Sequence, residues 1–267
     1  MSVLVFDIET IPDLMLLRKQ HKLLAQTDEE VLQAAQQLRQ GNGQSSFHPH
    51  YQHQVVAIAV AYANEEGFKL WSLGGPEEGE AKIIQRFFHI IEQRKPQLVS
   101  WNGSGFDLPV LHYRALYHGI AAPAYFDQGE VDPQFKWNNY LNRYHMRHLD
   151  LMDFLAGFQA RAYAPLDGIA QSLGLPGKQG MDGSDVAAAY WDGRLAEIRQ
   201  YCESDVLNTY GVFLRTQCMR GHLTPKTYVD ALERVKTHLA QKNDPFWDSF
   251  QQWVAEEVAR SIPLSTQ

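Results

Sequence analysis

The chain opens on an apolar run, Val3–Thr10, which two carboxylates interrupt at alternate positions, Asp7 and Glu9. Successive side chains of a β-strand point to opposite faces, so these two acids would share one face about 6.6 Å apart. Two anions this close on a buried strand repel each other and lose hydration unless a cation binds between them. The stretch therefore predicts a site for Mg²⁺ or Mn²⁺. In the alternative interpretation, the strand ends at Phe6 and both acids are solvated loop residues.

The segments that follow predict an α/β fold. The almost continuous apolar run Gln54–Tyr62 is typical of a strand covered on both faces, and Phe68–Trp71 is its hairpin partner. With the opening strand they make an antiparallel three-strand unit. The apolar spacing over Glu77–Arg94 predicts a helix that crosses back to a short strand at Gln97–Ser100. Strands and helices therefore alternate, as they do in a sheet flanked by helices.

Composition limits the class of protein. The 267 residues, 45% of them hydrophobic, are enough for one α/β domain with additions. Neither cysteine, Cys202 or Cys218, lies in a zinc-type spacing, so we expect no disulfide framework. The net charge of -7 argues against binding duplex nucleic acid by general electrostatics. The sequence shows neither a secretory leader pattern nor an apolar run that could span a membrane, so we expect a cytoplasmic protein.

A helical insertion is expected after the opening strand, over residues 14–50. Apolar residues at helical spacing within residues 14–40 predict two helices, followed by a loop at Gly41–Ser46. Three histidines then precede the second strand. They could suggest metal ligation, but a polar segment that leads into the strand explains them more simply. The three are His48, His50 and His53.

A second helical addition is expected at the other end of the sequence. Apolar spacing predicts helices at Lys226–Gln241 and Pro245–Ala259. We expect residues 221–267 to form an extension packed on the domain of residues 1–220.

Two further acids lie where the sequence predicts that a strand ends and a helix begins. Asp107 follows a turn with two glycines and a serine, and falls in the first helical turn, where an acid suits the helix dipole. A favourable interaction with the helix dipole would by itself explain an acid at position 107, and a metal-binding role is the alternative. Asp150 lies in the strand-to-helix element His148–Leu155. It is either a helix N-cap, the simpler interpretation, or an outer acid of the site.

A long helix is predicted at Arg194–Arg215. Tyr201 and Asp205 stand four residues apart and therefore lie one above the other on a single face of this helix. Glu203 points elsewhere. The helix would thus present a phenol and a carboxylate together.

Aromatic and basic residues are interleaved between Tyr125 and His148, most densely over Lys136–His148. In grooves that hold single-stranded nucleic acid, rings stack on bases and cations follow the phosphates. An ordinary loop with aromatic anchors in the core is the alternative. Lys178, in a glycine-rich loop, could contact a phosphate or simply be solvated.

Three motifs occur in order at distances suited to one domain: Asp-x-Glu-Thr from Asp7, Asn-x-x-x-Phe-Asp from Asn102 to Asp107, and Tyr-x-x-x-Asp from Tyr201 to Asp205. Together they closely resemble the DnaQ-like (DEDD) 3′→5′ exonucleases, in the tyrosine-containing DEDDy subfamily that includes the proofreading domains of family B DNA polymerases. Within that group the chain is most similar to the stand-alone bacterial proteins described as predicted PolB-like exonucleases. The resemblance covers residues 1–220.

This resemblance implies a ribonuclease H-like fold, in which an antiparallel three-strand unit and parallel strands form one mixed sheet flanked by helices. It also implies that two divalent ions, Mg²⁺ or Mn²⁺, are held by four converging acids: Asp7, Glu9, Asp107 and Asp205. Tyr201 would orient the attacking water. The implied substrate pocket has as its candidate residues Thr10, Ile11, Trp101, Asn102, Phe106 and Lys178. For Asn102 and Phe106, plain loop packing is the alternative.

An enzyme of this kind would hydrolyse the phosphodiester bond at the 3′ end of single-stranded DNA and release nucleoside 5′-monophosphates. The resemblance includes no polymerase domain, so the activity would be free-standing. The same chemistry on RNA stays open, because four acids and this architecture do not distinguish the two sugars. A catalytically idle module that binds nucleic-acid ends or a protein is the other alternative. Complete acid and tyrosine motifs argue against it, because four carboxylates without metal would repel phosphate.

Overall fold

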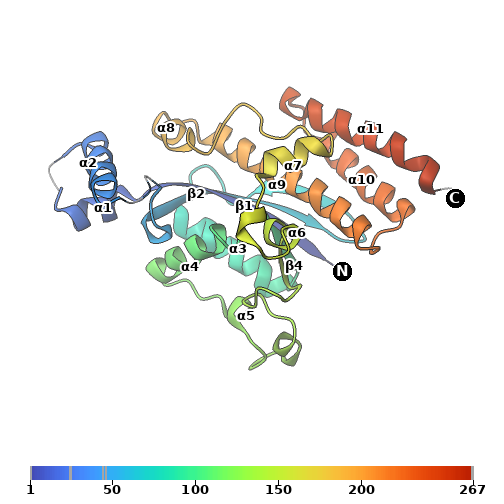
Figure 1. Ribbon diagram of the computed structural model, residues 1–267, viewed down its shortest axis with the longest axis horizontal. Helices are drawn as coiled ribbons and strands as arrows, with labels where there is room; N and C mark the ends of the chain where they lie inside the picture. The colour runs from blue at the N-terminus through green and yellow to red at the C-terminus, as the bar shows by residue number, and fades with distance from the viewer. Residues whose placement is uncertain (1, 24–25, 44, 46, 266–267) are drawn as a thin grey trace.

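A mixed β-sheet forms the centre of the molecule (Figure 1). The computed structural model describes residues 2–23, 26–43, 45 and 47–265, with the backbone alone for 261–265. The strands are β1 (Val3–Pro12), β2 (His53–Ala63), β3 (Phe68–Ser72), β4 (Gln97–Ser100) and β5 (His148–Asp150). Their order is β3-β2-β1-β4-β5. The pairs β1–β2 and β2–β3 are antiparallel, whereas β1–β4 and β4–β5 are parallel.

This topology confirms the expected fold class. An antiparallel three-strand unit continued by two parallel strands is the ribonuclease H-like arrangement that the resemblance implies. The predicted hairpin and the short strand β4 are both present. Strand β1 runs past both acids to Pro12, so the alternative in which it ends at Phe6 is wrong.

The two edges of β1 pair with neighbouring strands over different lengths. On one side it pairs with β2 along its whole length, with an irregularity in register between Glu9 and Thr10. On the other side, within the described part of the chain, its ladder with β4 covers Val3–Val5 alone. The edge of β1 beside Asp7 is therefore free of strand pairing, and the chain that leaves β4 can cross there.

Eleven α-helices surround the sheet in the described part of the chain. They are α1 (Leu14–His21), α2 (Asp28–Gly41), α3 (Glu80–Arg94), α4 (Asp107–His118), α5 (Pro123–Phe126), α6 (Leu151–Leu155), α7 (Leu166–Ser172), α8 (Val186–Trp191), α9 (Leu195–Met219), α10 (Pro225–Leu239) and α11 (Asp248–Ser265). Helix α8 is not predicted by the apolar spacing, because six residues are too few to show a helical period. None of the described helices is long and apolar enough to cross a membrane.

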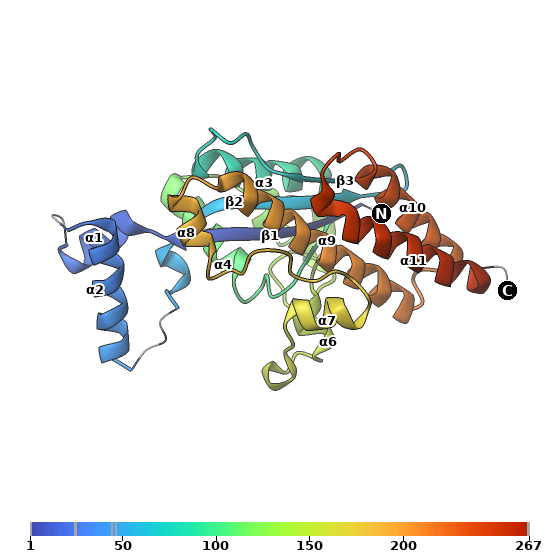
Figure 2. The same ribbon diagram turned by 90° about the horizontal axis from the view of Figure 1, so that it is seen from above.

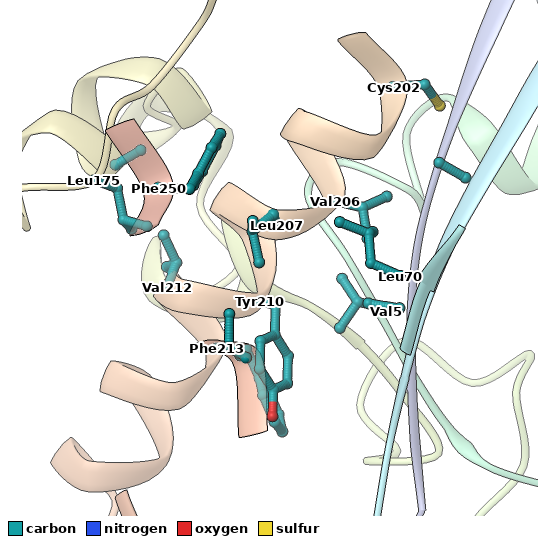
Figure 3. Packing of buried hydrophobic residues seen from close by; sticks show 14 of the residues in the cluster. Val5, Leu70, Leu175, Cys202, Val206, Leu207, Tyr210, Val212, Phe213 and Phe250 are labelled. Carbon is teal, nitrogen blue, oxygen red and sulfur yellow. The ribbon is translucent and has the colours of Figure 1, made fainter. Parts of the chain in front are cut away.

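The alternation along β1 sorts its side chains between two hydrophobic clusters. One face packs with α3 and α4 and consists of Leu4, Phe6 and Ile8. Val5 lies on the other face, in the cluster that α9 forms with the sheet (Figure 3). Asp7 and Glu9 share the side of Val5 because strand side chains alternate. The fold therefore directs both acids toward α9.

The two helices predicted near the start of the chain are confirmed, and they lie beyond one end of the sheet (Figures 1 and 2). They share a small cluster of their own, made of Leu17, Val31 and Ala35. Asp13, just before α1, pairs with Arg114 of α4 over 2.6 Å, which ties this part of the chain to the domain. In the predicted loop Gly41–Ser46, Gly41 belongs to α2, and residues 44 and 46 lie outside the described residues.

Both predicted C-terminal helices are also confirmed. Helix α10 contacts β3 and α11, and side chains of both helices join the cluster around α9. Glu257 of α11 is 1% exposed and connects three helices. Its carboxylate accepts a hydrogen bond from the Tyr228 hydroxyl of α10 (2.9 Å). It also pairs with Arg215 of α9 (3.2 Å) and with Arg260 of its own helix (3.1 Å).

We expect Glu257→Ala to lower the free energy of unfolding by about 2 kcal/mol, because the buried Tyr228 hydroxyl loses its acceptor. The loss stays this small because Arg215 and Arg260 are exposed enough to regain water. Urea unfolding followed by circular dichroism measures it. The exposed neighbour Glu256 gives the control, Glu256→Ala, which should leave the midpoint unchanged. Equal midpoints for the two variants would show that this carboxylate does not hold the helices together.

Candidate active site

The structure brings the predicted acids together where β1 passes under α9. Asp7 and Glu9 stand on β1, Asp107 is the first residue of α4, and Asp205 stands on α9. The charges of Asp107, Glu9 and Asp205 all raise the pKa of Asp7. Oxygen atoms of Asp7 and Glu9 and the Cys202 sulfur lie within 4.8 Å of one another. The site is therefore a concentrated cluster of acids on three elements.

Asp107 is positioned by a tight turn, Trp101–Phe106, between β4 and α4. Asn102 adopts the left-handed conformation, with φ of 63°. At Gly103 the backbone passes so close to β4 that a Cβ would lie 2.3 Å from the Ser100 hydroxyl oxygen. The turn needs these two positions to bring Asp107 back beside β1.

Asp150 braces this turn from β5. Its carboxylate accepts hydrogen bonds from the backbone N–H groups of Asn102 and Ser104, both at 2.9 Å. It also caps α6, accepting from the N–H of Met152 at 3.1 Å, so the capping interpretation is confirmed. The same carboxylate thus caps one helix and fixes the turn that carries Asp107.

Helix α9 presents Tyr201 and Asp205 on one face, as their spacing predicts. Tyr201 is buried, and its burial raises the pKa of its hydroxyl above the ordinary value. The charges of Asp205, Glu9 and Asp7 raise this pKa further. Glu203 points away from the site, as expected. It accepts a hydrogen bond from the Ser72 hydroxyl (2.8 Å) and pairs with Lys242.

All four acids resist ionisation in the absence of a bound cation. Burial, followed by the neighbouring carboxylates, holds the pKa of Asp7 and of Glu9 well above the usual range. Burial raises the pKa of Asp107 to about 7, and that of Asp205 to about 6 even though the Tyr201 hydroxyl acts against the rise. Buried carboxylate oxygens that lack a balancing charge are suitable ligands for a hard divalent cation.

Three of the predicted substrate-binding residues stand near the acids in sequence, two after Glu9 and one before Asp107, but lie in different surroundings. The Thr10 hydroxyl is 2.9 Å from Nδ1 of His53. Ile11 is 3% exposed and packs in the hydrophobic core, so its side chain is closed off from a bound strand. Trp101, at the start of the turn, is partly buried against the same core.

Phe106, the residue before Asp107, packs against the segment that precedes β2. Its ring lies 5.5 Å from that of Phe47 and 5.2 Å from that of His53. Nε2 of His50 is 2.8 Å from the Gly105 carbonyl oxygen. The histidines thus join this segment to the active-site turn. They are absent from the donor cluster found among the described residues, which favours a polar segment that leads into the strand over metal ligation.

Lys178 lies in an exposed loop near the cluster. Its ammonium group pairs with Asp182, and its backbone N–H donates to Asp167 at 2.8 Å. Its charge lowers the pKa of Glu9 and of Asp205, against the larger effect of burial. Lys178 is therefore close enough to influence the site while it is held by a surface acid.

In the aromatic and basic stretch between Tyr125 and His148, some rings are anchored in the core and others are exposed. Tyr140 donates to the Pro96 carbonyl oxygen (2.7 Å), and His148 contacts the Ser100 hydroxyl (2.8 Å), so these rings are core anchors. Trp137 is 78% exposed and Tyr144 is also exposed. A pocket of about 470 Å³ lies between this stretch and the active-site turn, and its lining includes Asn102, Tyr140 and Arg143.

Cys202 is the site residue that sequence reasoning missed. Its thiol lies 3.4 Å from the backbone oxygen and 3.5 Å from the carboxylate of Asp7. The available signal was its position three residues before Asp205, which places it near the same face of the helix. A single cysteine outside any Cys-rich pattern gave no reason to use that signal.

Comparison with known proteins identifies the class. The chain belongs to the family described as predicted 3′–5′ exonucleases related to the exonuclease domain of PolB, whose pattern matches residues 45–254. This membership supports a 3′–5′ exonuclease activity. The matched region contains Asp107, Tyr201 and Asp205, and β1 with its two acids precedes it.

Two polymerases each contain a region that is similar to this chain. A DNA polymerase from Pyrococcus glycovorans is 33% identical over 85 residues, which are 29% of this chain and 11% of that protein. The structure of a family B DNA polymerase from the archaeon Pyrobaculum calidifontis aligns with a TM-score of 0.49 at 17% identity, over 99% of this chain and 28% of the polymerase. The chain therefore spans a minor part of the length of each.

The raised pKa of Asp107 predicts a pH-dependent penalty in EDTA. Its pKa is about 7 in the folded chain and about 3.9 in an unfolded one. Below the unfolded pKa, Asp107 is protonated in both the folded and the unfolded chain and does not change the free energy of unfolding. As the pH rises above that value and through the folded pKa of about 7, the unfolded chain loses its proton more readily, and the free energy of unfolding falls. Asp107→Asn cannot ionise. We therefore expect this variant to gain about 2 kcal/mol in free energy of unfolding over the native chain between about pH 5 and about pH 8.

The quantity to measure is the difference between the two proteins at each pH, by chemical unfolding in EDTA. Three histidines act with the opposite sign over part of this range, because desolvation lowers their pKa to about 4; they are the buried His53 and His148 and the half-buried His112. Excess Mg²⁺ should reduce the difference at pH 8. A difference independent of pH would mean that Asp107 is already ionised and balanced.

Proposed function

We propose that this protein is a metal-dependent 3′→5′ exonuclease that hydrolyses the terminal phosphodiester bond of single-stranded DNA and releases nucleoside 5′-monophosphates. The observation that carries the proposal is the meeting of Asp7, Glu9, Asp107 and Asp205 under α9, with every pKa raised. A fold gains nothing from such a cluster by itself, since burial and repulsion both destabilise it. A bound pair of cations would reverse both effects.

We assign the four acids to two divalent ions, Mg²⁺ or Mn²⁺. Two such ions would supply a nucleophile at neutral pH and stabilise charge on the attacking and leaving oxygens. Asp7 would contact both ions. Glu9 and Asp205 would complete the ligands of one, and Asp107 would help to hold the other.

Tyr201 would position the attacking water through its hydroxyl. Its raised pKa keeps the phenol protonated at neutral pH, so the hydroxyl can donate a hydrogen bond but does not serve as a bulk base. Its place one helical turn from Asp205 supports this role.

We propose that the substrate is single-stranded, because the exposed rings of the stretch between Tyr125 and His148 offer stacking surfaces and the net charge of -7 gives no general affinity for duplexes. Phe106 and Asn102 border the turn that carries Asp107 and are the first candidates to contact the terminal nucleotides. Lys178 would leave Asp182 to meet a phosphate. RNA as the substrate is an outcome of the test below.

We further propose that residues 1–220, with the helical insertion 14–50, form the exonuclease domain and that residues 221–267 extend it. The packing of α10 on β3 and the Glu257 contacts support one folding unit.

Asp7→Ala should abolish hydrolysis and leave the fold intact or more stable, because it removes the central charge of the cluster. The assay compares 5′-labelled single-stranded DNA and RNA of equal sequence with Mg²⁺, Mn²⁺ or EDTA. A ladder shortening from the 3′ end, absent in EDTA, is the expected result. Asp192→Ala, which removes an exposed acid that is not one of the four, is the matched control and should retain full activity. Full activity in pure Asp7→Ala would overturn the metal assignment, and faster loss of RNA would correct the substrate.

Tyr201→Phe should slow turnover by about 10²-fold at saturating substrate, within the range for groups that position a reacting proton. Tyr210→Phe, the same substitution on the same helix but in the hydrophobic cluster, should leave the rate unchanged. Single-turnover rates of the two variants make the comparison. If both retain the native rate, the Tyr201 hydroxyl has no part in the reaction.

A further inference from the structure

Cys202 lies inside the acid cluster, and the proposed hydrolysis makes no use of it. Its side chain is fully buried on the face of α9 that is turned toward β1 and β2 (Figure 3). We propose that Cys202 is a third ligand, with Asp7 and Glu9, for a single thiophilic divalent ion such as Zn²⁺ or Cd²⁺, which occupies the site in place of Mg²⁺ and inhibits the enzyme. The binding stands on geometry alone, and only the inhibition rests on the proposed function.

The donor atoms are already close to the arrangement such an ion requires. With a Zn–S bond of about 2.3 Å and a Zn–O bond of about 2.0 Å, tetrahedral coordination separates sulfur and oxygen by about 3.5 Å. The Cys202 sulfur is 3.5 Å from the carboxylate oxygen of Asp7. With Glu9 included, all three donors lie within 4.8 Å of one another, so small side-chain shifts would complete the site.

Glu9 supplies a second and independent observation. Its side chain is only 8% exposed, and no described residue donates a hydrogen bond to its carboxylate. A buried carboxylate without a donor is costly, and Glu9 faces the same space as the Cys202 sulfur. An ion placed there would gain two oxygen ligands without breaking a bond that either carboxylate makes to a backbone group or a basic side chain.

Ligand softness separates this ion from the catalytic ones. Mg²⁺ prefers oxygen and would leave the thiol protonated, whereas Zn²⁺ and Cd²⁺ form strong bonds to thiolate. On binding, the S–H bond of Cys202 breaks, a metal–sulfur bond forms, and the proton passes to solvent water. Asp7 and Glu9 would then no longer be available to Mg²⁺.

The test is a titration of the full chain with Cd²⁺ in metal-free buffer, followed by the ultraviolet charge-transfer absorption of a cadmium–thiolate bond. We expect one thiolate band, saturating at one ion per chain, that Cys202→Ser and Cys202→Ala both abolish. Cys218→Ser is the matched control, since Cys218 is the other free cysteine and lies on the same helix; it should keep the band. No band in the native chain, or a band that Cys202→Ser retains, would overturn the assignment.

A second measurement addresses inhibition. With Mg²⁺ present, Zn²⁺ should inhibit the native chain and Cys218→Ser alike, and Cys202→Ser should need at least about tenfold more Zn²⁺, in line with the loss of one ligand. Circular dichroism checks that the variants fold. A chain that degrades no strand under any condition would remove the proposed function but leave the cadmium result standing. Equal Zn²⁺ sensitivity of native and Cys202→Ser proteins would remove the inhibitory role.

Discussion

Repulsion among buried carboxylates is the constraint on which the rest of this structure depends. Burial raises the pKa of Asp7, Glu9, Asp107 and Asp205, and the charges of the neighbouring acids of the cluster raise the pKa of Asp7 and of Glu9 further. Without the fold, these four carboxylates would move apart and be hydrated. Each is instead held by an element with its own source of stability: β1 by two hydrophobic clusters, Asp107 by a braced turn, and Asp205 by a helix of 25 residues packed on the sheet. The architecture holds together charges that oppose one another.

Other buried acids of the chain have different surroundings, and the difference supports the role that we propose for the cluster. Glu257 is more deeply buried than Glu9, yet a phenol and two guanidinium groups surround it, and it joins three helices. Asp150 is buried and satisfied by backbone N–H groups. Buried acids in this protein are therefore given donors where their role is structural. Glu9 receives no hydrogen bond from any described residue, which supports the cation that we propose as its partner.

Local pattern was enough to predict much of this fold. Alternation placed Asp7 and Glu9 on one face of β1, and helical spacing placed Tyr201 above Asp205, because both periods are properties of the backbone. The convergence of β1, α4 and α9 came from the resemblance of three motifs, since no local period reports a contact across some 200 residues of sequence. The packing of Phe47 on Phe106 was missed for the same reason. Cys202 was missed because a lone cysteine in a helix is usually a small core residue.

The free edge of β1 connects these observations. A strand paired on both sides over its whole length would have no room for a turn beside its acids, and β4 stops pairing after Val5. Trp101–Phe106 uses that opening to bring Asp107 toward β1, and Asp150 fixes the turn through backbone groups, which no side-chain substitution in the turn removes. The position of Asp107 is thus decided by the backbone geometry of a turn, whereas Cys202 and Asp205 reach the same space from α9. Neither of the two backbone hydrogen bonds that fix the turn involves Cys202, so the brace on Asp107 does not depend on the residue at 202. The framework that positions Asp107 is therefore separable from the side chain that we propose as an additional metal ligand.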